Sequence, residues 1–249
     1  MKHRKMRKTE KGEGQGRTRS SPFPVFAVVL GVLLPACTTH ELIVPGTYRI
    51  RGVYEVQVPT AWNRVPDFKE IWTMDGLPLQ SLTFFPPLAG GRSIAGRRNK
   101  RQDIAPPVFR RSMTEMEIMD FLETSWRLLW IRDMQDGHIK TQTAHLRPET
   151  IGNEGGFSFE MEWSDETLVD FKGLFFCVVK NGRLHVALYR GTRVGFYDRH
   201  LADARAVMES LHILGNRKNT GKGNATNDDA GDNDMFMDWE SILERLGEI

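Results

Sequence analysis

Residues 168–192, LVDFKGLFFCVVKNGRLHVALYRGT, decide the fold, because two arms rich in β-branched and aromatic residues flank the pair Asn181-Gly182. An Asn-Gly pair is typical of a two-residue turn of the primed type, whose twist matches that of two antiparallel strands. We therefore predict a hairpin with strands over residues 168–180 and 183–192.

Other strand-like segments precede this hairpin. Residues 139–146 and 156–163 lie directly before it, and Asp75-Gly76 marks a second turn in the first half of the chain. The strands expected in that first half cover residues 48–51, 53–59, 69–74 and 79–85. Their alternation of apolar and polar residues is the period of a strand with one buried face.

Two helices are expected among these strands. Thr114 and Glu117 form a capping box, which starts a helix that should end near Gly137. Its apolar residues recur at helical spacing: Met119, Leu122, Trp126, Leu129 and Trp130. A second helix should run from about Asp198 to Leu211. Residues 47–214 thus predict an α+β domain, a mostly antiparallel sheet packed with two main helices, either both on one side or one on each side.

The order of elements resembles the PsbP-like (Mog/PsbP) superfamily of α/β/α domains. The resemblance covers roughly residues 47–214 and is carried by Tyr54-x-Val56-x-Val58-Pro59-x-x-Trp62, a strand pair ending in Phe84-Phe85, the mid-chain helix, Gly155-Gly156 and the Asn181-Gly182 hairpin before a final helix. It implies an α/β/α sandwich. It also implies kinship with bacterial lipoproteins and with accessory subunits that act by binding proteins, without shared catalytic residues.

Residues 1–36 predict an export signal. The first 20 residues hold eight Lys/Arg, and an uncharged apolar stretch runs from Pro22 to Leu34. A positive segment before a short apolar stretch and a small-residue cleavage site is typical of a signal peptide, and the stretch is too short for a comfortable membrane span of about 20 residues. The alternatives are an ordinary signal peptide cut nearby and an uncleaved membrane anchor; each places the domain outside the cytoplasm. Met6 is an alternative start to Met1.

The end of this signal resembles a bacterial lipobox, with Leu34 three residues before Cys37 and the small Ala36 directly before it. The resemblance implies that the thiol of Cys37 carries a lipid anchor, followed by a tether over residues 37–46. Thr38 after the cysteine, by resemblance to Gram-negative lipoprotein sorting, favours the outer membrane and a domain that faces the periplasm.

Composition and motifs argue against several functions. The first 20 residues carry a surplus of +6 and the whole chain only +2, so the exported part is negative and nucleic-acid binding is not expected. Cys177 is the one cysteine left besides Cys37, which excludes an internal disulfide. Seven scattered histidines show no metal-binding spacing, although His138 and His145 could face His185 across strands. We expect no catalytic set, no metal and no cofactor.

Two further candidate sites are a pair of carboxylates for catalysis and a pair of tryptophans for ligand binding. Glu160 and Glu162 share one strand face, which is more typical of a solvated surface than of paired acid-base catalysis. Trp126 and Trp130 would form part of the core, or else line a pocket for a small ligand or lipid between helix and sheet. Cys177 lies in an apolar strand and is expected to be a buried hydrophobe.

Residues 86–112 form a long, basic loop rich in glycine and proline. Its positive residues are Arg92, Arg97, Arg98, Lys100, Arg101, Arg110 and Arg111. The loop is either solvated and mobile or a contact for anionic lipid head groups beside the anchor, where each basic residue contributes up to about 1 kcal/mol.

The chain ends in a disordered linker, residues 215–234, and an amphipathic helix, residues 235–249. The helix has Trp239, Ile242, Leu243 and Leu246 on one face. It would dock back on its own domain or contact an envelope protein. The sequence therefore predicts a membrane-anchored lipoprotein that acts as a non-catalytic binding or accessory domain, with a small-ligand or lipid carrier as the alternative.

Overall fold

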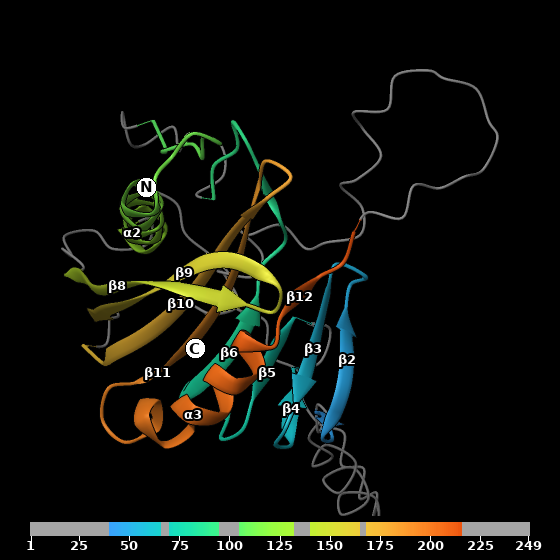
Figure 1. Ribbon diagram of the computed structural model, residues 1–249. Helices are drawn as coiled ribbons and strands as arrows, with labels where there is room; N and C mark the ends of the chain where they lie inside the picture. Colours follow the sequence, from blue (N-terminus) through green and yellow to red (C-terminus); the bar gives the residue numbers. More distant parts are fainter. Residues whose placement is uncertain (1–39, 66–69, 95–104, 132–139, 165–167, 216–249) are drawn as a thin grey trace, which may run out of the picture. The chain divides into compact units, whose positions relative to one another are not determined.

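The structure is a computed structural model that describes residues 40–65, 70–94, 105–131, 140–164 and 168–215 (Figure 1). All of these residues fall within one compact unit that begins at Thr39. The export signal with Cys37, nearly all of the linker 215–234 and the segment 235–249 lie outside the described residues and stay predictions.

The described elements are mostly strands. In chain order they are β1 Glu41–Ile43, β2 Gly46–Ile50, β3 Tyr54–Val58, β4 Trp62–Arg64, β5 Ile71–Thr73, β6 Gln80–Phe84, β7 Leu88–Ala89, α2 Glu115–Ile131, β8 Thr141–Ile151, β9 Glu154–Ser164, β10 Asp170–Lys180, β11 Arg183–Thr192, α3 Phe196–Glu209 and β12 His212–Ile213.

The β10–β11 hairpin lies inside the main sheet. The strand order is β1-β4-β5-β6-β11-β10-β9-β8, β7 also pairs with β11, and every pair is antiparallel. Lys180 pairs with Arg183, and both Asn181 (φ 52°) and Gly182 (φ 72°) are left-handed, as a primed turn requires. The predicted hairpin is confirmed, with its first strand beginning at Asp170 instead of Leu168.

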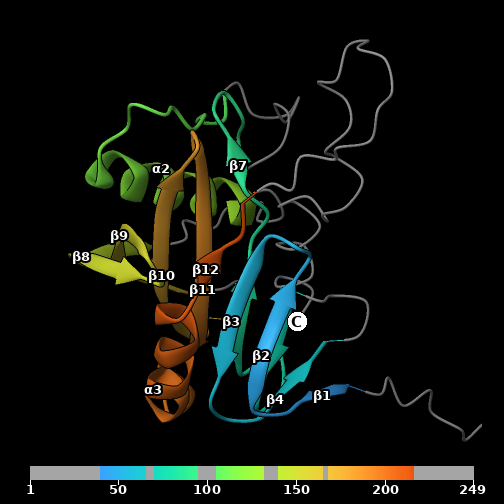
Figure 2. The same ribbon diagram turned by 45° about the vertical axis from the view of Figure 1, so that its right-hand side comes forward.

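A second, smaller sheet was not predicted. It has the order β12-β3-β2 and packs with α3 on one face of the main sheet (Figure 2). β12 follows α3 and pairs with β3, so the end of the domain closes on its beginning. The tether expected over residues 37–46 is also corrected, because β1 begins at Glu41 and pairs with β4.

The two faces of the main sheet are both buried. Phe171, Phe175 and Cys177 of β10 belong to the core beneath α2, whereas Leu174 and Phe176 belong to the core beneath α3. Successive side chains of a strand point to opposite faces, which explains the continuous apolar run of this strand. One helix therefore covers each face, as in an α/β/α sandwich, and the predicted fold class is confirmed.

The capping box at the start of α2 is confirmed. The Thr114 amide donates to the Glu117 carboxylate at 2.7 Å, and the Glu117 amide donates to the Thr114 hydroxyl at 3.3 Å. The first of these bonds lowers the pKa of Glu117. The helix is described as far as Ile131, and Gly137 lies outside the described residues.

The strands β8 and β9 are longer than predicted. Each has 11 residues, and Gly152 (φ 58°) lies in the turn that joins them. A β-bulge interrupts their pairing between Ala144 and Arg147. The predicted approach of His145 to His185 is wrong, because β9 and β10 separate the two strands that carry them.

We expect Phe159→Ala to cost about 3–5 kcal/mol of unfolding free energy, because this fully buried ring stacks on Phe175 at 4.7 Å and its loss leaves a cavity. Leu168→Ala, at a side chain that is 85% exposed, is the control and should change stability by less than about 0.5 kcal/mol. Urea denaturation measures both. Equal losses would contradict the packing described.

Candidate functional site

The basic loop is more ordered at its two ends than predicted. The Gly91 amide donates to the Phe109 carbonyl at 2.8 Å, and the Phe109 amide donates to the Arg92 carbonyl at 2.9 Å. Ile94 and Phe109 are buried in the core beneath α2, and β7 pairs with β11. The interpretation as a wholly solvated loop is therefore wrong for the arms 86–94 and 105–112.

These arms bring four exposed arginines to one end of the sandwich. Arg92 follows β7, Arg110 and Arg111 precede α2, and Arg183 begins β11 after the Asn181-Gly182 turn. We call this region the turn-end surface: Arg92, Arg110, Arg111 and Arg183, with the exposed apolar residues Val108 and Met116. Arg183 was not among the candidate contact residues predicted from the sequence. Its position at the start of a predicted strand does not indicate that its side chain lies near the loop 86–112.

Arg111 lies over the hairpin turn. A Cβ atom built on Gly182 would be 2.7 Å from Arg111 Nε, and one on Gly90 would be 3.2 Å from Arg111 Cγ. The side chain thus fills space that only glycine leaves open. This contact places the loop arm and a positive charge beside the β10–β11 turn.

The charges of the turn-end surface are only partly balanced. Arg110 is 4.0 Å from Glu117, and Glu115 lies in the same first turn of α2. Within the described ranges, no carboxylate is an ion-pair partner of Arg92 or Arg111. The apolar side chains of Val108 (40% exposed) and Met116 (60%) lie beside these charges. Exposed apolar residues beside unbalanced charges suit a protein or peptide surface of opposite charge.

The other predicted contact residues cannot be placed on this surface. Arg97, Arg98, Lys100 and Arg101 lie outside the described residues, as do Cys37 and the helical residues Trp239, Ile242, Leu243 and Leu246. Of the seven basic residues predicted, the structure therefore brings together Arg92, Arg110 and Arg111.

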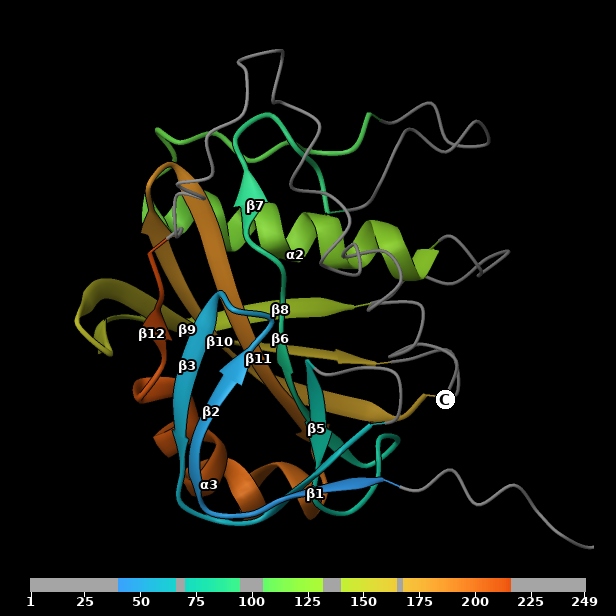
Figure 3. The same ribbon diagram turned by 90° about the vertical axis from the view of Figure 1, so that its right-hand side faces the viewer.

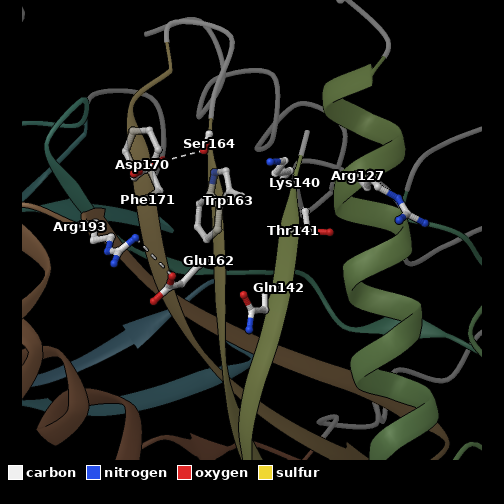
Figure 4. Close-up of a pocket in the computed structure, with 10 residues that line it drawn as sticks. All are labelled: Arg127, Lys140, Thr141, Gln142, Glu162, Trp163, Ser164, Asp170, Phe171 and Arg193. Atoms are coloured by element: carbon white, nitrogen blue, oxygen red, sulfur yellow. Dashed lines mark hydrogen bonds and ion pairs between the residues drawn. The ribbon is translucent and has the colours of Figure 1, made fainter. Parts of the chain in front are cut away.

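A groove of about 560 Å³ lies at the opposite end of the sandwich, where β8, β9 and β10 meet the last turns of α2 (Figure 4). Its walls carry the cations Arg127, Lys140 and Arg193 and the rings of Trp163 and Phe171. These two residues are only 2% and 6% exposed, and polar and apolar atoms contribute about equally to the surface of the groove. The groove does not favour a carrier of apolar ligands.

The interpretation of Trp126 as a core residue is confirmed. Its ring meets Trp163 at 5.1 Å and Phe175 at 6.0 Å between centroids, so these rings fill the space between helix and sheet at this point. The side chain of Trp130 lies outside the described residues. Cys177 is fully buried, and burial raises the pKa of its thiol, which suits a core residue better than a nucleophile.

Glu160 and Glu162 each face a different cation. Glu160 is 3.0 Å from Lys172 and 2.8 Å from His145, whereas Glu162 is 3.8 Å from Arg193. Partial burial works to raise the pKa of Glu160, but hydrogen bonds from Lys172 and His145 leave it below its usual value. A general acid needs the opposite shift, so this arrangement does not suit paired acid-base catalysis.

Among the described residues, no group of three or more His, Cys, Asp or Glu side chains could hold a metal ion. No helix in the same part of the chain is both long and apolar enough to cross a bilayer.

The chain matches no protein-family model, and no curated protein matches it in sequence. Solved structures similar to it include a PsbP protein. This is the cyanobacterial PsbP (CyanoP) of Synechocystis sp. PCC 6803, with 10% identity, 72% of this chain and 96% of that chain covered, and a TM-score of 0.40.

Two further solved structures are similar. One is LpqN, involved in cell envelope biogenesis of Mycobacterium tuberculosis, with 8% identity, 73% of this chain and 88% of that chain covered, and a TM-score of 0.31. The other is a structure from Bacteroides thetaiotaomicron VPI-5482, with 7% identity, 70% and 50% covered, and a TM-score of 0.34. Similarities of this size concern the fold and carry no conclusion about binding.

We expect His185 to make the domain sensitive to acid. Burial, followed by the charges of Lys180 and Arg183, lowers the pKa of His185 to about 4, and the ring is hydrogen-bonded to Tyr54 Oη at 3.2 Å. The unfolded chain, with a His pKa of about 6.5, binds more protons between these values. This group should therefore remove about 3 kcal/mol of stability as the pH falls from about 6.5 to about 4.

Urea denaturation at about pH 7.5 and about pH 4.5 measures this loss. His185→Gln keeps a polar group near Tyr54 but has nothing to titrate, so its stability should fall less than that of the natural chain. The same loss in both proteins would show that other groups, such as Glu160, cause the acid sensitivity.

Proposed function

We propose that the protein is a lipid-anchored, extracytoplasmic lipoprotein of the cell envelope, held at the outer membrane and facing the periplasm. Its folded domain acts as a non-catalytic accessory domain that binds a protein partner. The observation that carries the anchoring is the lipobox-like sequence from Leu34 to Cys37 after an uncharged apolar stretch. Two or more acyl chains on Cys37 would give stable membrane binding.

The start of β1 limits how far the domain can move from its anchor. Only residues 38–40 separate Cys37 from Glu41, so the four Cα–Cα steps span at most about 15 Å. In Figure 3, β1 begins on the side where β8 and β10 begin, whereas the β10–β11 turn and the start of α2 lie on the opposite side. A short tether there would direct the turn-end surface away from the anchoring membrane.

This placement favours an acidic protein surface over the head groups beside the anchor as the partner of the turn-end surface. Arg92 and Arg111 offer positive charge, while Val108 and Met116 offer apolar contact area. Charge complementarity of this kind directs association and specificity. The periplasm-facing side is also where a partner could reach the domain.

The anchoring is tested at Cys37. Mass spectrometry of the mature N-terminal peptide should find a diacylated or triacylated cysteine as its first residue. Cys37→Ser should abolish that modification, leave the precursor uncleaved at this site and prevent lipid attachment. An unmodified Cys37 thiol in the exported protein would contradict the proposal.

The binding role is tested by photo-crosslinking in cells with a chain that ends at Gly215, which keeps both cores because their last residue is Ile213. A photoreactive residue at Met116 should give a protein adduct, and Arg92→Glu with Arg111→Glu should reduce it at least about tenfold by charge repulsion. Leu168, exposed at the other end, is the matched position and should not give that adduct.

The outcomes at Met116 separate the alternatives. An adduct with lipid would favour the head-group contact of the basic loop. An adduct that survives the two charge reversals, or none at all, would contradict the turn-end surface as the binding face.

A further inference from the structure

We propose that the acidic C-terminal segment of this chain, residues 235–249, docks on the turn-end surface of its own domain. The juxtaposition that suggests this is the exit of the chain beside that surface. The Lys180 ammonium donates to the Ile213 carbonyl at 3.1 Å, and Lys180 directly precedes the Asn181-Gly182 turn on which Arg111 packs. The chain therefore leaves β12 at the same end of the sandwich.

The views of the fold agree with this placement. β12, the tip of the β10–β11 hairpin and the start of α2 lie on one side in Figure 3, and Figure 2 shows β12 ending near β7. β7 is followed by Arg92, and its Ala89 pairs with Arg183. Arg92 and Arg183 thus lie next to β7, and the described chain ends near β7 after β12.

The charges of the C-terminal segment and of the turn-end surface are complementary. The segment 235–249 contains one cation, Arg245, against four acidic residues, Asp238, Glu240, Glu244 and Glu248, and the chain directly before it adds Asp228, Asp229, Asp232 and Asp234. The turn-end surface has four arginines against Glu115 and Glu117. Attraction of this kind is strong at low ionic strength and is screened by salt.

The C-terminal segment and the turn-end surface both contain apolar residues that could pack together. Trp239, Ile242, Leu243 and Leu246 fall at helical spacing, and a short amphipathic helix in water needs a surface against which to bury such a face. Val108 and Met116 are exposed apolar side chains among the arginines. The segment and the surface therefore match in both charge and apolar character.

The length of the intervening chain allows the contact. The composition of residues 216–234, rich in Gly, Asn and Asp, predicts a flexible tether, and the 20 Cα–Cα steps from Gly215 to Met235 would give it a root-mean-square span of about 25 Å. A tether of this length keeps the segment at millimolar effective concentration, so even a weak contact would be occupied. The segment would then compete with the partner proposed above, although the docking itself does not depend on that partner.

Disulfide trapping tests the docking in the chain from Thr38 to Ile249, which lacks Cys37 and in which Cys177 is fully buried. Met116→Cys combined with Leu243→Cys should form an intramolecular disulfide at least about tenfold faster than Leu168→Cys combined with Leu243→Cys. Leu168 is more exposed than Met116 but lies at the start of β10, away from the turn-end surface.

Two further variants make the result specific. Val108→Cys with Leu243→Cys should also be trapped quickly, and this pair covers the case in which Met116→Cys disturbs α2. Arg92→Glu with Arg111→Glu, or about 0.5 M salt, should remove most of the advantage over the Leu168 pair. Equal rates of disulfide formation for the Leu168, Val108 and Met116 pairs would overturn the docking. Rates that do not change with the charge reversals or with salt would overturn it as well.

Failure here and failure of the proposed function are distinguishable. The trapping uses purified protein without membrane or partner, whereas the crosslinking above uses a chain that lacks the segment. A protein adduct at Met116 in the chain that ends at Gly215 would support the turn-end surface as a binding face. If disulfide trapping then failed in the chain that ends at Ile249, only the docking of residues 235–249 would be contradicted.

Discussion

The structure depends on the burial of both faces of the β10–β11 hairpin. Aromatic and aliphatic side chains alternate between the two faces along β10, so the sheet is stable only if each face is covered. α2 covers one face, and α3 with the small sheet covers the other. The order of the remaining elements follows from this need, because the chain must cross from one face to the other and return.

The link between the small sheet and the main sheet is polar at its centre. Tyr54 of β3 is fully buried and donates its hydroxyl hydrogen to the Phe85 carbonyl at 2.8 Å, and the same oxygen meets the His185 ring. Buried polar groups of this kind are tolerated when each finds a partner. They also connect β3 of the small sheet to Phe85, directly after β6, and to β11 of the main sheet.

The sequence was sufficient for elements whose signals are local. The Asn181-Gly182 turn, the capping box of Thr114 and Glu117, and the alternation in the second half each reflect contacts between residues close in the chain. The resemblance to PsbP-like domains supplied the layer order. These signals together gave the fold class and the two helices.

What the sequence could not provide were pairings between distant short strands. β1, β7 and β12 have two or three residues each, too few for a periodic pattern, and each is defined by a partner elsewhere in the chain. The turn-end surface was hidden for the same reason. Arg183 and Arg111 are 72 positions apart, and they come to one end of the sandwich through the pairing of β7 with β11 and the packing of Arg111 over Gly182.

The two ends of the sandwich differ in how far their charges are balanced within the domain. At the groove end, Glu162 lies close to Arg193, and Asp170 accepts a hydrogen bond from Ser164 at 2.6 Å, so much of the polarity there is satisfied within the domain. At the turn end, Arg92 and Arg111 have no described carboxylate as an ion-pair partner. Under the anchoring proposed at Cys37, only three residues would separate the lipid-bearing residue from β1. The acidic segment that we propose to dock beside Arg92 and Arg111 would then be the first ligand that the proposed external partner has to displace.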